Sequence, residues 1–287
     1  METILKSAKK QLVISPEKPT VLIGERINPT GKKRLAAALA GGDLELVRQE
    51  ALAQVEAGAD ILDVNVGAAG VDEVELLPQA VRAVMETVDA PVCIDTANLE
   101  ALRAALAVHQ EMAPEGKPLI NSVNGEEERL ESVLPLAAEY KTAVIGLAMD
   151  DDGIPTSAEK RLAVARKIVE RAEPLGIPPE DIVVDCMALT VGVDSKAGVV
   201  TLEAIKMVRE ELGLNMTLGA SNVSFGLPER EVINWAFLTL AIQNGVNAPI
   251  VNAAKVRSAI LATDLLLGRD KDGMRYVKAY KKRKRAG

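Results

Sequence analysis

The chain has 287 residues, which suits one large domain or two small ones, and 48% of them are hydrophobic, enough for a large core. Aromatic residues make up only 2%, so the core must consist of Ala, Val, Leu and Ile, as parallel barrels favour. The net charge of −7 argues against nucleic acid as the main partner. Because the sequence has neither an apolar run of about 18 residues nor a signal peptide in METILKSAKKQLV, we expect no membrane span and a cytoplasmic protein.

Eight short apolar runs recur along the chain. They are rich in Val, Ile and Leu and lack regular polar alternation, which is typical of strands buried on both faces. The runs are Val21–Gly24, Ile61–Val66, Val92–Ile94, Leu119–Ile120, Ala143–Ala148, Ile182–Val184, Met216–Gly219 and Pro249–Val251.

Longer segments separate the runs, and Asp43–Glu56, Ala158–Glu173 and Leu202–Leu212 show the three- and four-residue apolar spacing of amphipathic helices. Strand and helix alternating eight times predict an α/β fold, the (β/α)8 or TIM barrel. A doubly wound open sheet is the alternative, although neither GxGxxG nor GxxxxGK[ST] follows the first run. We expect residues 1–20 to form a short N-terminal extension and residues 21–287 a single barrel domain.

Carboxylates and amides lie in or directly after nearly every run. Any one of them could be a turn former or a helix cap. Capping alone does not require such residues at nearly every strand, and the C-terminal strand ends of a barrel carry its active site. The residues are Glu25, Asn28, Asp63, Asn65, Asp95, Asn121, Asn124, Asp150, Asp185, Asn222 and Asn252.

Other catalytic chemistries have little support. His109, the single histidine, lies in the helical stretch after the third run, so we expect it to pack or to face solvent. Cys93 and Cys186 form no CxxC pair, which argues against a thiol metal site and a disulfide framework. Carboxylates alone could hold a metal, but we predict none. The basic segment Lys278–Arg285 is expected to be a solvated end.

A pterin ring suits a rim of carboxylates and amides. Its 2-amino and N3–H groups form a pair of donors that a carboxylate accepts side by side. Asn offers both C=O and NH₂, so it tolerates a ring nitrogen whose protonation changes during a reaction.

Three motifs support this reading by their resemblance to the pterin-binding methyltransferase family. They are GERINP at residues 24–29, LDVNVG at 62–67 and SNVSFGLP at 221–228, the last followed by Arg230. The similarity extends from about Val21 to Leu267. Two branches are close: the folate domain of cobalamin-dependent methionine synthase, which the third motif favours, and the free-standing methyltetrahydrofolate:corrinoid protein methyltransferases, which the chain length favours.

The resemblance implies roles for six residues. Asp95, Asn121 and Asp185 would hold the pterin edge, and Asn222 would contact N5 as the catalytic group. Glu25 would be a supporting contact, and Arg230 matches an arginine of the same loop.

The implied reaction moves a methyl group between N5 of tetrahydrofolate and the cobalt of a corrinoid (cobalamin) on a partner protein, in a direction left open, with no bound metal of its own. The resemblance also implies a homodimer. Two alternatives stay open: a condensation like that of dihydropteroate synthase, whose phosphate-binding motif is not seen, and a folate-binding subunit without catalytic activity.

Overall fold

The computed structural model describes residues 1–286, and the side chains of residues 1–284. Eight parallel strands are hydrogen-bonded in the order β10-β3-β4-β5-β6-β7-β8-β9. A parallel bridge between Gly219 and Ile250 joins the two edges, and Ile250 N donates to Leu218 O at 3.0 Å. The predicted (β/α)8 barrel is therefore confirmed. The strands are β3 (Ile23–Ile27), β4 (Ile61–Val64), β5 (Val92–Asp95), β6 (Leu119–Asn124), β7 (Ala143–Leu147), β8 (Ile182–Asp185), β9 (Asn215–Thr217) and β10 (Ile250–Val251).

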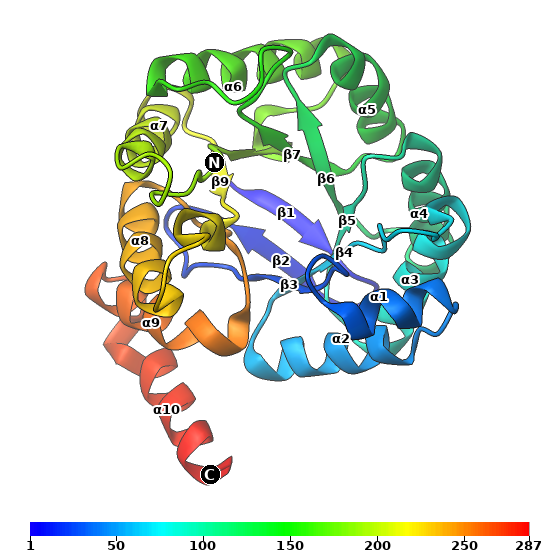
Figure 1. Ribbon diagram of the computed structural model, residues 1–287, viewed down its shortest axis with the longest axis horizontal. Coiled ribbons are helices and arrows are strands. Elements are labelled where there is room, and N and C mark those ends of the chain that lie inside the picture. The colour runs from blue at the N-terminus through cyan, green and yellow to red at the C-terminus, as the bar shows by residue number, and fades with distance from the viewer. Residues whose placement is uncertain (287) are drawn as a thin grey trace.

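A ring of helices surrounds the strands (Figure 1). Local capping starts several of them: the side chain of Asp72 accepts from Val74 N at 2.9 Å, and that of Asn98 accepts from Glu100 N at 3.0 Å. No helix among residues 1–286 is long and apolar enough to cross a membrane. The helices are α1 (Lys33–Ala40), α2 (Glu45–Ala57), α3 (Glu73–Thr87), α4 (Leu99–Met112), α5 (Glu127–Glu139), α6 (Ala158–Ala172), α7 (Ala197–Leu212), α8 (Arg230–Asn244), α9 (Ala253–Leu266) and α10 (Met274–Ala286).

The strands separate two apolar clusters, one inside the barrel and one between strands and helices. Side chains alternate along a strand, so every second residue points into the lumen. The lumen cluster includes Ile23, Ile61, Cys93, Leu119 and Val183. Two residues further along the same strands stand Glu25, Asp63, Asp95, Asn121 and Asp185. The lumen is therefore apolar in its middle, and the next lumen-facing residues toward the C-terminal ends of the strands form a polar mouth.

A β-hairpin closes the opposite end of the barrel. β1 (Thr3–Lys6) pairs antiparallel with β2 (Gln11–Ile14), and the hairpin lies across the barrel opening in Figure 1. Leu5 and Ile14 are fully buried in the lumen cluster. Lys6 forms a bridge with Lys117, just before β6 begins, which places the hairpin at the N-terminal ends of the strands. Only the C-terminal mouth is left for a ligand.

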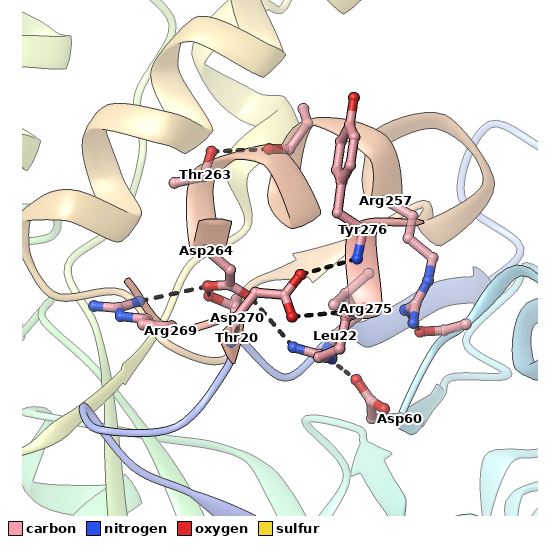
Figure 2. Close-up of polar contacts among 12 residues, drawn as sticks. Thr20, Leu22, Asp60, Arg257, Thr263, Asp264, Arg269, Asp270, Arg275 and Tyr276 are labelled. Carbon is pink, nitrogen blue, oxygen red and sulfur yellow. Dashed lines mark hydrogen bonds and ion pairs between the residues drawn. The ribbon is translucent and has the colours of Figure 1, made fainter. Parts of the chain in front are cut away.

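A polar network fixes the C-terminal helices to the start of the barrel (Figure 2). The buried Asp264 of α9 accepts from Thr20 N at 2.9 Å and from Thr20 Oγ1 at 2.7 Å, and Arg275 approaches it at 3.4 Å. Asp270 accepts from the backbone N–H groups of Arg275 and Tyr276. The basic segment expected to be a solvated end lies in a helix, α10, whose first turn is anchored, and its lysine and arginine side chains through Lys284 are exposed, as expected.

Strand lengths differ from those predicted. β3 runs through Glu25 to Ile27 and β6 runs through Asn121 to Asn124, although the apolar runs stopped earlier. An apolar run marks only the buried part of a strand, and the part that rises above the core is polar. Glu25 and Asn121 therefore lie within strands and not in the following loops.

Candidate functional site

Three carboxylates and one amide face each other at the mouth of the lumen. Asp63, Asp95, Asn121 and Asp185 occupy lumen-facing positions of β4, β5, β6 and β8. Asp95 and Asn121 are direct partners in the sheet register. Asp63 and Asp185 are buried, with 3% and 6% of their surface exposed. Ionising all three of these carboxyl groups is therefore unfavourable, because burial and mutual repulsion both oppose their negative charge.

On one side of the mouth, Asp63 contacts both Asn121 and Asp95. Asn121 Nδ2 donates to Asp63 Oδ1 at 3.1 Å. Burial, together with the charge of Asp95, raises the pKa of Asp63 well above its usual range, and the contact between the two carboxyl groups raises the pKa of Asp63 and lowers that of Asp95. Burial also raises the pKa of Asp95 to about 6, and hydrogen bonds from Asn65 and Asp63 oppose this rise. Near pH 7 Asp95 is the charged group.

Asp185 lies on the other side of the mouth and is held by the backbone. Its carboxylate accepts from Met187 N at 2.7 Å and from Gly219 N at 3.2 Å. Burial raises its pKa to about 6, and these two bonds oppose the rise. The buried Arg161 donates to Cys186 O at 2.8 Å and to Met187 O at 2.9 Å, which fixes the turn after β8.

Asn222 and Asp185 both lie against Gly219. Asn222 lies in a short 3-10 helix, η3 (Ala220–Ser224), after β9, and its side chain is exposed. A Cβ on Gly219 would lie 3.3 Å from Asn222 Nδ2, while Gly219 N binds Asp185. A side chain at position 219 would therefore crowd Asn222. Because residue 219 is glycine, the Asn222 amide can lie against the backbone that binds Asp185.

Arg230, the first residue of α8, ties η3 in place. Its Nε donates to Ser224 Oγ at 3.0 Å, its Nη2 donates to Ser221 O at 2.8 Å, and its guanidinium lies 5.8 Å from the centre of the Phe225 ring. Two donors from one planar fork fix both ends of the turn that carries Asn222. Arg230 therefore acts as a positioning residue for this loop.

Substituting Arg230 with Met should loosen this loop without unfolding the barrel. Because both hydrogen bonds disappear, we expect amide hydrogen exchange in residues 220–228 to quicken about tenfold, while exchange in the strands stays unchanged. Lysine keeps the charge but not the fork, so Arg230→Lys should not restore protection. Mass spectrometry of exchanged peptides measures both. Equal protection in Arg230→Met and the unsubstituted chain would show that η3 is held by other contacts.

Glu25 stands at the β3 side of the mouth and borders a separate pocket. Burial raises its pKa, and the positive charges of Lys32, Arg26, Arg230 and Lys255 oppose this rise. The pocket has a volume of about 270 Å³ and is bordered by β3, η3, α8, β10 and α9.

The six residues identified from sequence thus take three places. Asp95, Asn121 and Asp185 meet at the mouth, Asn222 lies beside Asp185, and Glu25 and Arg230 line the neighbouring pocket. The set missed two members of the same network. Asp63 and Asn65 follow Ile61 at intervals of two, and this alternation is the signal that places both on the lumen side.

The single histidine lies outside this network. His109 is buried in α4, where burial lowers its pKa to about 4, so it is a neutral packing residue. Among residues 1–286, no three His, Cys, Asp or Glu side chains are grouped so that they could hold a metal ion.

Comparison with known proteins gives three findings. A family model described as pterin binding enzyme matches residues 24–252. The methylcorrinoid:tetrahydrofolate methyltransferase of Eubacterium limosum is 33% identical over 273 residues, which cover 92% of this chain and 97% of that protein. Methionine synthase of Mycobacterium leprae is 31% identical over 257 residues, 84% of this chain but 21% of that protein, so the chain spans about a fifth of its length.

Solved structures match in fold. Dihydropteroate synthase of Yersinia pestis, with a pterine-sulfa conjugate, has a TM-score of 0.70 and covers 93% of this chain and 99% of its own, at 17% identity. The enzyme of Xanthomonas albilineans has a TM-score of 0.68 at 23% identity, with 93% of this chain and 99% of its own covered. At such identities the likeness concerns the fold alone.

Proposed function

The chain belongs to the family of pterin-binding enzymes, and on this premise we propose that it transfers a methyl group between N5 of tetrahydrofolate and the cobalt of a corrinoid on a partner protein. The observation that carries the proposal is the 33% identity to the methylcorrinoid:tetrahydrofolate methyltransferase over 97% of that protein. The carboxylate and amide mouth supports it, because such a mouth binds by hydrogen bonds and offers no nucleophile of its own.

In this proposal Asp95, Asp185 and Asn121 bind the pyrimidine side of the pterin. A carboxylate accepts side by side from the 2-amino and N3–H groups, and an amide matches the mixed donors and acceptors that follow. Because the pKa of each aspartate is about 6, both are charged near pH 7 and can accept. Asp63 would act indirectly, by donating to Asp95 and accepting from Asn121.

Asn222 would bind N5, the atom whose bonding changes. The corrinoid supplies a cobalt centre that gives up or takes a methyl cation and keeps or donates the electron pair. Loss of a methyl group from N5 requires a proton or a strong hydrogen bond at N5, and gain of a methyl group requires loss of the N5 proton. The amide of Asn222 can accept from N5–H in one state and donate to the N5 lone pair in the other. We propose transfer to tetrahydrofolate as the physiological direction, after the name of the similar Eubacterium limosum protein.

Folate affinity should depend on pH through the two aspartates. Their raised pKa of about 6 means that both lose their charge as the pH falls through 6, and the pterin donors then lose their acceptors. We expect the Kd for tetrahydrofolate to rise about tenfold between pH 7.5 and pH 5.5. Anaerobic calorimetry measures the profile, and Asp185→Asn should flatten it. A Kd constant over this range would exclude the aspartates as charged acceptors.

The activity itself is tested with purified chain, tetrahydrofolate and methylcobalamin, free or on a corrinoid protein. Cob(I)alamin and 5-methyltetrahydrofolate should form together, and the reverse mixture should form methylcobalamin, which the visible spectrum records. Lack of turnover in both directions with both forms of corrinoid would refute the proposal. Folate binding without turnover would then favour a subunit that stores or presents folate.

We also propose a homodimer that works in the cytoplasm. Exposed apolar side chains on α8 and α9 support the dimer, among them Val232 at 60% exposure and Leu266 at 83%. Light scattering at micromolar concentration tests the dimer, and a monomeric mass would contradict it. Cell fractionation tests the location.

A further inference from the structure

Arg161 of α6 is the largest side chain that the described part of the fold buries completely, with 1% of its surface exposed. Its Nη1 donates to Thr201 Oγ1 at 3.0 Å and to the carbonyl oxygens of Cys186 and Met187, and its Nε donates to Pro155 O at 2.9 Å. All of these acceptors are neutral oxygens. A buried charge is ordinarily balanced by an opposite one nearby, and the two bound carbonyl groups directly follow the carboxylate at the end of β8.

A single peptide group joins Arg161 to that carboxylate, Asp185. The carbonyl oxygen of Cys186 and the N–H of Met187 are the two ends of one planar peptide bond. Arg161 binds the oxygen at 2.8 Å, and Asp185 accepts from the N–H at 2.7 Å. Because the plane is rigid, fixing the oxygen fixes the direction of the N–H, and a bond at one end of a peptide group also strengthens the bond at the other.

Met187 needs this support because its backbone conformation is unusual. Its φ of 60° lies in the left-handed region, which residues other than glycine seldom adopt. Arg161 Nη1 also donates to Met187 O at 2.9 Å, and Thr201 Oγ1 lies 3.2 Å from the same oxygen as a second donor. The peptide groups on both sides of Met187 are therefore held by side chains of α6 and α7.

The charge of Arg161 also acts on Asp185. Burial raises the pKa of Asp185 to about 6, the hydrogen bonds from Met187 N and Gly219 N oppose this rise, and the charge of Arg161 opposes it as well. Burial lowers the pKa of Arg161, and the charges of Cys186 and Asp185 oppose this change. Because burial raises the pKa of the Cys186 thiol, the thiol is neutral near pH 7, and Asp185 is the charge that balances Arg161.

We propose that Arg161 is the positioning residue of Asp185: it aims the Met187 N–H at the carboxylate and favours the ionised form that accepts from the pterin. The inference rests on the proposed function, in which Asp185 binds the 2-amino and N3–H groups. Arg161 is buried and acts through Asp185, so its loss should change folate affinity and the pH dependence of this affinity more than the rate at saturating folate.

The other groups around Asp185 determine how a pH profile should be read. Its partners in the sheet register, Leu147 of β7 and Thr217 of β9, are uncharged. Burial raises the pKa of Asp95, across the mouth, to about 6 as well. A change at Arg161 should therefore move only the part of the folate-binding profile that Asp185 contributes.

The first test is Arg161→Gln, which removes the charge and keeps a hydrogen-bond donor. Without the positive charge the pKa of Asp185 should rise, so the carboxylate becomes protonated, and stops accepting, at a higher pH. Anaerobic calorimetry over about pH 5 to 9 gives the Kd for tetrahydrofolate, and the Asp185 part of the profile should move up by about one pH unit. An unchanged profile would overturn the proposed effect of the charge.

Two variants test the position apart from the charge. Arg161→Lys keeps the charge but lacks the fork that binds several oxygens at once, so the profile should keep its midpoint while the Kd at about pH 8 rises about threefold. Thr201→Val removes an acceptor of Arg161 and a donor to Met187 O, and should raise the Kd about twofold. Urea unfolding checks that each variant is folded. If Arg161→Gln does not fold, these two variants decide, and an unchanged Kd in both would overturn the positioning.

Arg166→Gln is the matched control. Arg166 also lies on α6 and also reaches α7, where it pairs with Glu211 at 2.8 Å, but its side chain is 46% exposed. The control should leave the Kd and the midpoint unchanged, and an equal shift in this variant would overturn the role of Arg161.

A measurement without ligand separates this inference from the proposed function. If the unsubstituted chain binds no tetrahydrofolate, the proposed function fails. The carbon-13 carboxyl titration of Asp185, assigned with Asp185→Asn, still reports on Arg161, because Arg161→Gln should raise the midpoint by about one pH unit. An unchanged titration would overturn the inference.

Discussion

Asn222→Ala is expected to slow methyl transfer about 100-fold while the Kd for tetrahydrofolate rises no more than a few-fold. One positioned hydrogen bond to an atom whose charge changes is worth about this much in other enzymes. In the proposed mechanism the bond from Asn222 to N5 is strongest when the methyl group is in transit, so its loss should appear in the rate more than in ground-state affinity. Stopped-flow spectroscopy of the corrinoid gives the rate, and calorimetry gives the Kd.

Asn244→Ala is a suitable control, since Asn244 is at the end of α8 and its side chain donates to Leu240 O of the same helix. It should leave both quantities unchanged. An Asn222→Ala rate equal to that of the unsubstituted chain would remove Asn222 from the mechanism. Equal losses in rate and affinity would make it a binding residue.

Asp185→Asn should have the largest effect on folate affinity, with the Kd rising about 30-fold. A hydrogen bond to a charged acceptor contributes roughly 2 kcal/mol, and the neutral amide would also turn a donor toward the pterin donors. The loss should appear in the Kd and only secondarily in the rate at saturating folate. Asp194→Asn, on the exposed loop after β8, is the control. An unchanged Kd would mean that Asp185 faces the pterin with no bond to it.

The same variant should retain or gain stability. The folded pKa of Asp185, about 6, is above its ordinary value of 3.8, so the folded state binds a proton that the unfolded state has lost. Stability from this group is therefore full below pH 3.8 and is lost as the pH rises through 6, by about 3 kcal/mol. The amide avoids this loss but can accept only one of the two backbone donors. Urea unfolding at pH 7 should show no decrease, which separates the loss of binding from unfolding.

The barrel could be predicted from the chain because each strand carries its own signal. Runs such as Ile182–Val184 are apolar on both faces, and that pattern depends on local sequence alone. The hairpin could not be predicted, because its apolar runs, Ile4-Leu5 and Leu12–Ile14, are short, and the burial of Leu5 and Ile14 depends on a lumen built by distant strands.

The candidate site was predictable only in part, for the same reason. Asp95 and Asp185 are recognisable at strand ends, but the raised pKa of Asp63 depends on its burial and on the nearby charge of Asp95, which the sequence does not contain. Arg230 was identified by its place in a motif. Its hydrogen bonds to Ser221 and Ser224 show that it fixes the loop, which required the three-dimensional arrangement.

The hairpin of β1 and β2 affects the order in which the two substrates of the proposed reaction can bind. If the chain transfers methyl groups as proposed, the folate and the methyl carrier both reach the site through the C-terminal mouth, because Leu5 and Ile14 fill the N-terminal end. A carrier protein docked over the mouth would hinder folate from entering or leaving. Turnover should then follow a compulsory sequence, with folate binding before the carrier arrives and leaving after it departs. An excess of carrier should therefore inhibit by trapping the folate-bound enzyme.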